Sequence, residues 1–118
     1  MNLKKFFKSF VHAGRGLRHA WMKEQNFRIK FLTGIAVFVL MYYIDVTFYE
    51  EIILTLLVFL VLSLELVNTS IEHLSDLVES KINKKVKVVK DLAAGSVLLI
   101  SIVAAVIALF IFYPHFVG

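Results

Sequence analysis

The apolar residues of this chain are gathered into three long runs, and this pattern constrains the fold more than any other feature. The runs cover residues 31–44, 52–64 and 92–113. With 59% hydrophobic residues and a mean hydropathy of +0.81, the 118-residue chain is too apolar for an ordinary soluble domain. A membrane-spanning helix needs about 20 residues, so each run predicts one span once its flanks are included.

The expected fold is therefore an all-α membrane protein with a single domain. It consists of an N-terminal amphipathic surface helix followed by three transmembrane helices, of which the second extends into the cytoplasm. Their predicted bounds are 3–23 for the surface helix, 27–44, 51–80 and 91–113 for the spans, and 81–90 for a cytoplasmic loop before the third span. Pro114 is expected to end the last helix, because proline disrupts a helix interior.

The first 23 residues alternate bulky apolar residues with basic ones at helical spacing. One face carries Leu3, Phe6, Phe7, Phe10, Gly14, Leu17 and Trp21, and the other carries mostly lysine, arginine and histidine. This pattern is typical of a helix that lies in the membrane interface. The alternative is a soluble helix that packs on a core.

The basic residues predict the orientation in the membrane. All 13 lie either before Phe31 or between Lys81 and Lys90, and the segment between the first two runs carries none. The positive-inside rule then gives a cytoplasmic N-terminus and an external C-terminus. This topology accounts for the net charge of +4, so no nucleic-acid partner is expected. In the short external loop, Asp45 or Thr47 is expected to cap the second span.

A stripe of polar residues follows the second apolar run at helical spacing. Its members are Glu65, Asn68, Glu72, Asp76 and Glu79, at offsets of 3, 7, 11 and 14 from the first. Glu65 and Asn68 are predicted at membrane depth, where a carboxylate must be protonated, paired or exposed to a water-filled cleft. An acidic, solvated helix face would explain Asp76 and Glu79 well, but it explains Glu65 and Asn68 poorly.

These positions suggest chemistry at the cytoplasmic interface. Glu65 suits a general base that faces a hydroxyl group. Magnesium prefers oxygen ligands, and Glu72 and Glu24 both come from segments expected at that interface. Glu24 has a simpler interpretation as an ion-pair partner of Arg28, four residues later. The four histidines are scattered and are expected to be interface or surface residues, and the chain has no cysteine for a thiolate site.

Three segments resemble the small prokaryotic diacylglycerol kinase/undecaprenol kinase family. They are 65–76 (ELVNTSIEHLSD), 90–95 (KDLAAG) and 16–28 (GLRHAWMKEQNFR). The family pattern has a Glu, an Asn, a second Glu and an Asp at the places of Glu65, Asn68, Glu72 and Asp76. The chain departs from it at Ser70 and Ser96, where alanine is usual or common, and at residues 81–85, where the family often has a histidine.

The resemblance implies an integral-membrane homotrimer that transfers the γ-phosphate of MgATP to a lipid alcohol, at cytoplasmic-face sites shared between protomers in the inner membrane. Its implied roles are Glu65 as catalytic base, Glu24 and Glu72 as Mg²⁺ ligands that also bind ATP, Asn68 as a substrate-binding residue beside Glu65, Lys90 and Asp91 as ATP-binding residues, and Asp76 as a supporting residue.

The resemblance also favours undecaprenol as the lipid acceptor, because segments 26–29 and 93–95 look more like undecaprenol kinases than diacylglycerol kinases. Diacylglycerol is the alternative acceptor. Two hypotheses of another class stay open: a non-enzymatic membrane scaffold that uses the acidic stripe for assembly, and an ion pathway through Glu65 and Asn68.

Overall fold

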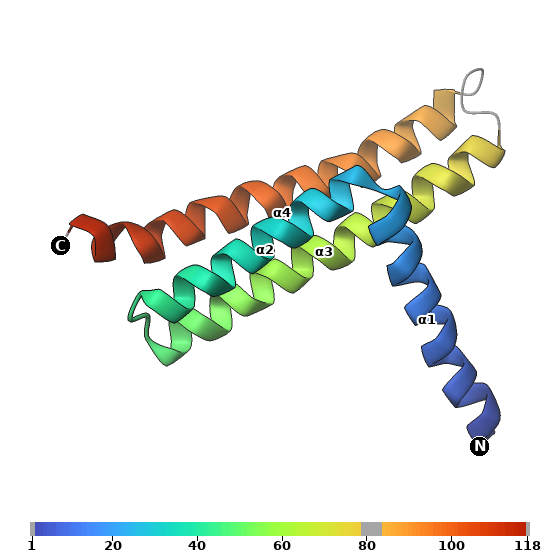
Figure 1. The fold of residues 1–118 in the computed structure, drawn as a ribbon. Coiled ribbons are helices and arrows are strands. Elements are labelled where there is room, and N and C mark those ends of the chain that lie inside the picture. The colour runs from blue at the N-terminus through green and yellow to red at the C-terminus, as the bar shows by residue number, and fades with distance from the viewer. Residues whose placement is uncertain (1, 79–83, 118) are drawn as a thin grey trace.

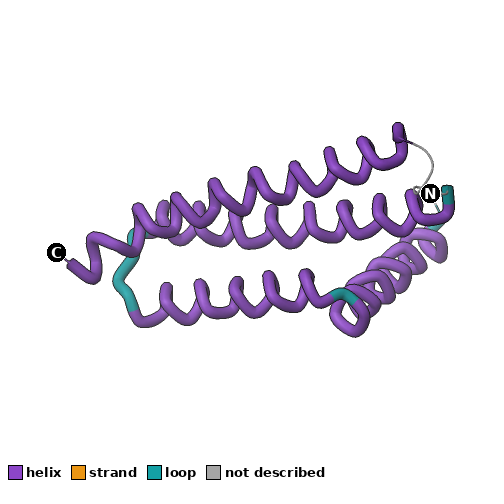
Figure 2. Tube along the Cα trace, turned by 90° about the horizontal axis from the view of Figure 1, so that it is seen from above, coloured by secondary structure: helices purple, strands orange, loops and turns teal. Residues whose placement is uncertain are grey.

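The computed structural model describes residues 2–78 and 84–117, which form four α-helices. These are α1 (Leu3–Lys23), α2 (Gln25–Tyr43), α3 (Phe48–Leu77) and α4 (Lys84–Val117). The last three run side by side in alternating directions, with α3 between α2 and α4, whereas α1 leaves the bundle steeply (Figure 1, Figure 2). The α1–α2 junction and the ends of α3 and α4 next to residues 79–83 lie toward one end of the bundle.

The helix starts follow from local capping. The Asn2 side chain accepts a hydrogen bond from the backbone N–H of Lys5, which satisfies one of the free donors of α1. Thr47 and Glu50 form a reciprocal capping box at the start of α3. The expectation that Asp45 or Thr47 caps this helix is confirmed for Thr47, and the capping box explains why α3 begins at Phe48 rather than at residue 51.

Two further predicted boundaries, both of α4, differ from the structure. The segment 84–90 was expected in a loop but is the start of α4, because lysine is a good helix former and the apolar period continues into the next run. Residues 81–83 of the predicted loop, and the predicted end of the second span at residue 80, lie outside the described residues. Pro114 was expected to end the last helix, yet α4 continues to Val117. A proline in the last turn costs only one backbone hydrogen bond.

Two small apolar clusters hold the bundle together. Leu54, Ile111 and Phe112 join α3 to α4, with partly buried residues of α2 packed around them. Ala20, Phe27 and Leu62 join the α1–α2 junction to α3. Between them α2 and α3 approach closely at Gly34, where a Cβ would stand 2.8 Å from Cγ1 of Val58.

Most of the apolar surface of the bundle is not covered by the chain itself. By length and composition α3 and α4 can each cross a membrane, yet only 22% and 17% of their most apolar windows are buried. A core helix of a soluble protein would be mostly buried, so these faces require lipid or a partner chain. α2 is less apolar than α3 and α4 because it contains Arg28 and Lys30, and a third span at α2 is a prediction.

The apolar face of α1 is also uncovered. Leu3, Phe6, Phe7 and Phe10 are each at least half exposed, and Ala20 is the buried residue of this helix. A soluble helix packed on a core would bury that face, so the packing alternative finds no support. An uncovered aromatic face opposite a cationic face suits a membrane surface.

Candidate active site

Glu65 is the most deeply buried charged residue that the structure describes. Only 2% of its surface is exposed, and its Oε2 lies 2.5 Å from Nζ of Lys30 on α2. Burying a carboxylate is costly unless it is paired, and the Lys30 ammonium provides the opposite charge. Of the three expected solutions for Glu65, the structure contains the ion pair. Lys30 turns inward, toward the opposite charge of Glu65.

An apolar cavity of about 240 Å³ lies between α2, α3 and α4, and Lys30 of the ion pair, but not Glu65, is one of its lining residues. Lys30 lines this cavity together with small and apolar side chains, which include Gly34, Leu57, Val58, Ala104 and Ala105. Ser101 on α4 also lines it, and its buried hydroxyl oxygen has no hydrogen-bond partner in the described residues. The cavity therefore combines an apolar interior with a charged group on its wall.

Asn68 lies one turn beyond Glu65 on α3 and is 7% exposed. Its Nδ2 donates a hydrogen bond to Oε1 of Glu72 at 3.3 Å, while its buried Oδ1 has no partner in the described residues. A buried acceptor without a partner costs about 1–3 kcal/mol, which a donor from a ligand would recover. The same stretch of α3 buries Thr69 and Ser75, to which the sequence analysis gave no role.

Glu24 forms the break between α1 and α2. Its extended backbone makes it the last cap of one helix and the first cap of the next, but its carboxylate makes no side-chain capping bond. The carboxylate Oε1 lies 3.0 Å from Nε2 of His73 on α3. Arg28, the expected partner of Glu24, donates to the carbonyl oxygens of Trp21 and Met22 instead. The ion pair between Glu24 and Arg28 was therefore a wrong expectation.

The predicted nucleotide-binding residues lie where α4 meets the end of α3. Lys90 Nζ pairs with Oδ1 of Asp76 at 3.0 Å, an exposed contact that joins the two helices. Lys87 pairs with Asp91 at 2.9 Å along one face of α4. The cationic groups are only partly buried, so both lysines are accessible to an anionic ligand.

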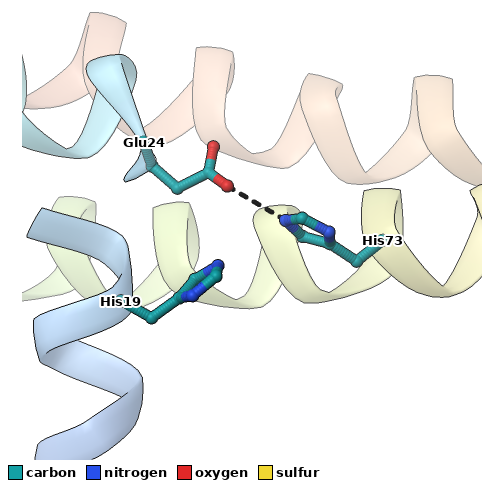
Figure 3. A group of neighbouring side chains, drawn as sticks. All are labelled: His19, Glu24 and His73. Carbon is teal, nitrogen blue, oxygen red and sulfur yellow. Dashed lines mark hydrogen bonds and ion pairs between the residues drawn. The ribbon is translucent and has the colours of Figure 1, made fainter. Parts of the chain in front are cut away.

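The structure thus connects the predicted residues in three local sets: Glu65 with Lys30, Asn68 with Glu72, and Lys90 with Asp76. It does not join the two predicted metal ligands in one cluster. Within residues 2–78 and 84–117, Glu24 clusters with His19 and His73 rather than with Glu72 (Figure 3). Lys30 was not predicted as a site residue, and His19 and His73 were expected only as interface or surface residues, where they do lie exposed. A lysine inside an apolar stretch, which needs a counter-charge, was the available signal for the first.

Comparison with known proteins defines the class of this helical protein. Residues 11–112 match the sequence profile of a protein family described as "Prokaryotic diacylglycerol kinase". An undecaprenol kinase of Bacillus subtilis is 40% identical over 112 residues, which cover 95% of this chain and 91% of the relative. A diacylglycerol kinase of Escherichia coli K12 is 28% identical over 112 residues, covering 95% and 92%. A diacylglycerol kinase of Synechocystis is 37% identical over 100 residues, covering 84% of this chain but 57% of the relative.

The fold and these similarities define a helical membrane protein with kinase activity toward a lipid. More specifically, the chain belongs to the prokaryotic diacylglycerol kinase family. It is a lipid kinase, ATP is its phosphoryl donor, and the resemblance drawn from its motifs is confirmed.

Proposed function

We propose that this chain phosphorylates undecaprenol to undecaprenyl phosphate with MgATP at the cytoplasmic face of the inner membrane. The observation that carries the proposal is the buried Glu65 carboxylate, paired with Lys30 on the wall of an apolar cavity. A phosphoryl acceptor with one hydroxyl group and a long hydrocarbon tail matches that combination. Diacylglycerol is the second candidate, because several similar proteins are named diacylglycerol kinases.

In this mechanism Glu65 accepts the proton of the lipid hydroxyl as the oxygen attacks the γ-phosphate, and the bond from the γ-phosphorus to the bridging oxygen breaks so that ADP leaves. General-base catalysis requires the base within hydrogen-bond reach of that proton. The hydroxyl group competes with Lys30 for the Glu65 carboxylate. The unpartnered Oδ1 of Asn68 lies one turn away and accepts a hydrogen bond from the same hydroxyl group while the acceptor binds, before that proton passes to Glu65. Phosphoryl transfer depends mostly on positioning and on charge neutralisation, so the lysine near the reacting groups also helps.

Only part of the acceptor tail, next to its hydroxyl group, occupies the cavity of about 240 Å³ between α2, α3 and α4. Its apolar lining favours a polyisoprenoid chain, whose only polar group is its hydroxyl. Diacylglycerol also carries two ester groups, which lose hydrogen bonds to water when buried in an apolar site. The similarity to an undecaprenol kinase at 40% identity supports the same choice.

Glu24 and Glu72 are the proposed ligands of Mg²⁺, and Lys90 and Asp91 the proposed contacts of ATP. The carboxylate donors suit this hard cation, and the hydrogen bond from Asn68 orients Glu72. Bound Mg²⁺ would neutralise charge on the phosphates. Lys90 would exchange Asp76 for a phosphate group, because both partners attract its ammonium in the same way.

We further propose three spans, a cytoplasmic N-terminus and a homotrimeric assembly. α2 has 19 residues, which at 1.5 Å per residue is about 28 Å and close to the hydrocarbon thickness. The described lysines and arginines outside α1 lie toward the bundle end where α3 and α4 join, as the positive-inside rule requires. The uncovered faces of α3 and α4 offer surface for neighbouring protomers, which would share the sites between them.

The test is a phosphorylation assay of the purified protein with undecaprenol and diacylglycerol side by side. We expect ATP consumption only when a lipid alcohol is present, with undecaprenol the faster acceptor. Glu65→Gln should lower kcat by about 100- to 10,000-fold, the usual contribution of a general base. Glu51→Gln is the matched control, since this exposed glutamate lies at the other end of α3.

Three outcomes would revise the proposal. Full activity of Glu65→Gln would remove Glu65 as the base. Faster phosphorylation of diacylglycerol would reverse the acceptor. An absence of phosphorylated lipid with either acceptor, together with loss of the oligomer in Glu65→Gln, would favour the scaffold hypothesis.

A further inference from the structure

The α1–α2 junction brings together three metal-ligating side chains from three places in the sequence. His19 lies on the last turns of α1, Glu24 at the break, and His73 on α3 (Figure 3). One ligand atom of each lies within 4.8 Å of the others. The His19 and His73 rings meet edge to face with their centres 5.9 Å apart.

The local fold holds the Glu24 carboxylate toward the histidines. A carboxylate at a helix start normally accepts hydrogen bonds from its own helix, but that of Glu24 does not. The junction is fixed by the bonds from Arg28 to two carbonyls of α1 and by contact between the Trp21 and Phe31 rings. The Glu24 carboxylate is therefore available to a ligand, while its backbone position is well defined.

The ligand atoms need only small shifts to bind one ion. Tetrahedral zinc with bonds of about 2.0–2.1 Å separates neighbouring ligand atoms by about 3.3 Å. The Glu24–His73 pair is already at 3.0 Å. The side chain of His73 is 60% exposed and His19 is also exposed, so both rings can rotate and water can deliver the ion.

We propose that His19, Glu24 and His73 bind a divalent transition-metal ion of the Zn²⁺ type. Two imidazoles and one carboxylate with an open fourth position suit Zn²⁺ and Co²⁺, whereas Mg²⁺ prefers oxygen ligands alone. This site is distinct in chemistry from the Mg²⁺ site proposed at Glu24 and Glu72, but it uses the same Glu24 carboxylate.

The shared carboxylate has a consequence for the reaction, which rests on the proposed function. An ion held by the two histidines occupies Glu24 and withdraws it from Mg²⁺. Zn²⁺ would then inhibit phosphoryl transfer at concentrations far below those of Mg²⁺, since nitrogen-containing sites bind Zn²⁺ more tightly.

Binding is tested first, without ATP or lipid, on untagged purified protein. Co²⁺ should produce the strong visible absorption of a tetrahedral complex, and Zn²⁺ should abolish it at one ion per chain. His19→Ala and His73→Gln should each weaken Zn²⁺ binding by about 100-fold or more, because even losses outside the ligand shell cost about 10–100-fold. His12→Ala is the matched control, since His12 is an exposed histidine of α1 outside the cluster.

Circular dichroism and gel filtration confirm that each variant is folded before its affinity is compared. Equal Zn²⁺ affinity in wild type and both cluster variants would overturn the proposal, as would equal losses in His12→Ala. An effect of His73→Gln without one of His19→Ala would contradict the three-ligand site.

The inhibition arm compares activity with and without Zn²⁺ at fixed MgATP. We expect His73→Gln to lose at least tenfold in Zn²⁺ sensitivity. Tight three-ligand binding without inhibition would retain the metal site and instead remove Glu24 from the proposed Mg²⁺ site.

Discussion

Lys30 and Glu65 lie far apart in the sequence and meet between α2 and α3. The lysine side chain is 26% exposed and that of the glutamate is 3% exposed, so the glutamate has lost far more hydration. Removing one member of a buried ion pair leaves the other charge uncompensated, which costs about 3–5 kcal/mol. The pair therefore links the stability of the bundle to the residue that we assign as the base.

This link gives a prediction that separates structure from catalysis. Lys30→Met should lower the thermal midpoint in detergent and abolish activity, because Glu65 is then buried without a counter-charge. The double variant Lys30→Met/Glu65→Gln should regain much of the lost midpoint and stay inactive, because the base is still missing. Recovery of activity in the double variant would contradict the role of Glu65, and an unchanged midpoint in Lys30→Met would contradict the buried pair.

Sequence periodicity predicts which residues share a helix face but not which helices meet. The polar stripe on α3 was readable from the spacing of Glu65, Asn68 and Glu72, since one helix contains them all. The partners from other helices, Lys30 and His19, depend on the packing of the bundle and on the break at Glu24. The need for a counter-charge to Glu65 pointed to Lys30, but no sequence signal pointed to His19.

At the scale of the elements, the four described helices were predictable, three from their long apolar runs and α1 from its amphipathic spacing. Their ends were less so, because caps and neighbours decide them: the capping box sets the start of α3, and the helix-forming lysines of residues 84–90 extend α4. The close contact of α2 with α3 at Gly34 has no sequence signal beyond a single glycine in an apolar run.

That contact predicts a destabilised variant. Gly34→Leu should lower the free energy of unfolding by about 1–3 kcal/mol, because the new side chain overlaps Val58 across the interface. Gly14→Leu is the matched control on α1, where a Cβ has no neighbour within 4 Å. Thermal unfolding followed by circular dichroism measures both. An equal loss in the two variants would point to a general effect of replacing a helical glycine rather than to close packing.

At the scale of the whole molecule, the described lysines and arginines of the bundle gather toward one end, and the α2–α3 loop, which we propose to be external, lies at the other (Figure 1). The chain has no cysteine, so single cysteine substitutions report the membrane topology without background labelling of native thiols. With a membrane-impermeant maleimide, Asp45→Cys should react in intact cells. His12→Cys and Lys87→Cys should react only after the membrane is opened.

The reverse labelling pattern would invert the proposed orientation. Labelling of Lys87→Cys and His12→Cys on opposite sides would remove one of the three proposed spans. Detection of each variant in the membrane fraction is the control for expression, and kinase activity is the control for folding.

Because α3 is one continuous helix, it fixes the distance between the residues that we propose for the reaction. Glu65 and Glu72 stand seven residues apart on one unbroken helix, which at 1.5 Å per residue is about 10 Å. No loop separates them, so neither can drift relative to the other while the helix stays intact. Inserting one alanine between Asn68 and Glu72 would rotate everything beyond it by about 100° and lengthen the interval by about 1.5 Å. The distance between the proposed acceptor site at Glu65 and the proposed metal site at Glu72 is thereby set by the helix backbone and not by the flexibility of side chains.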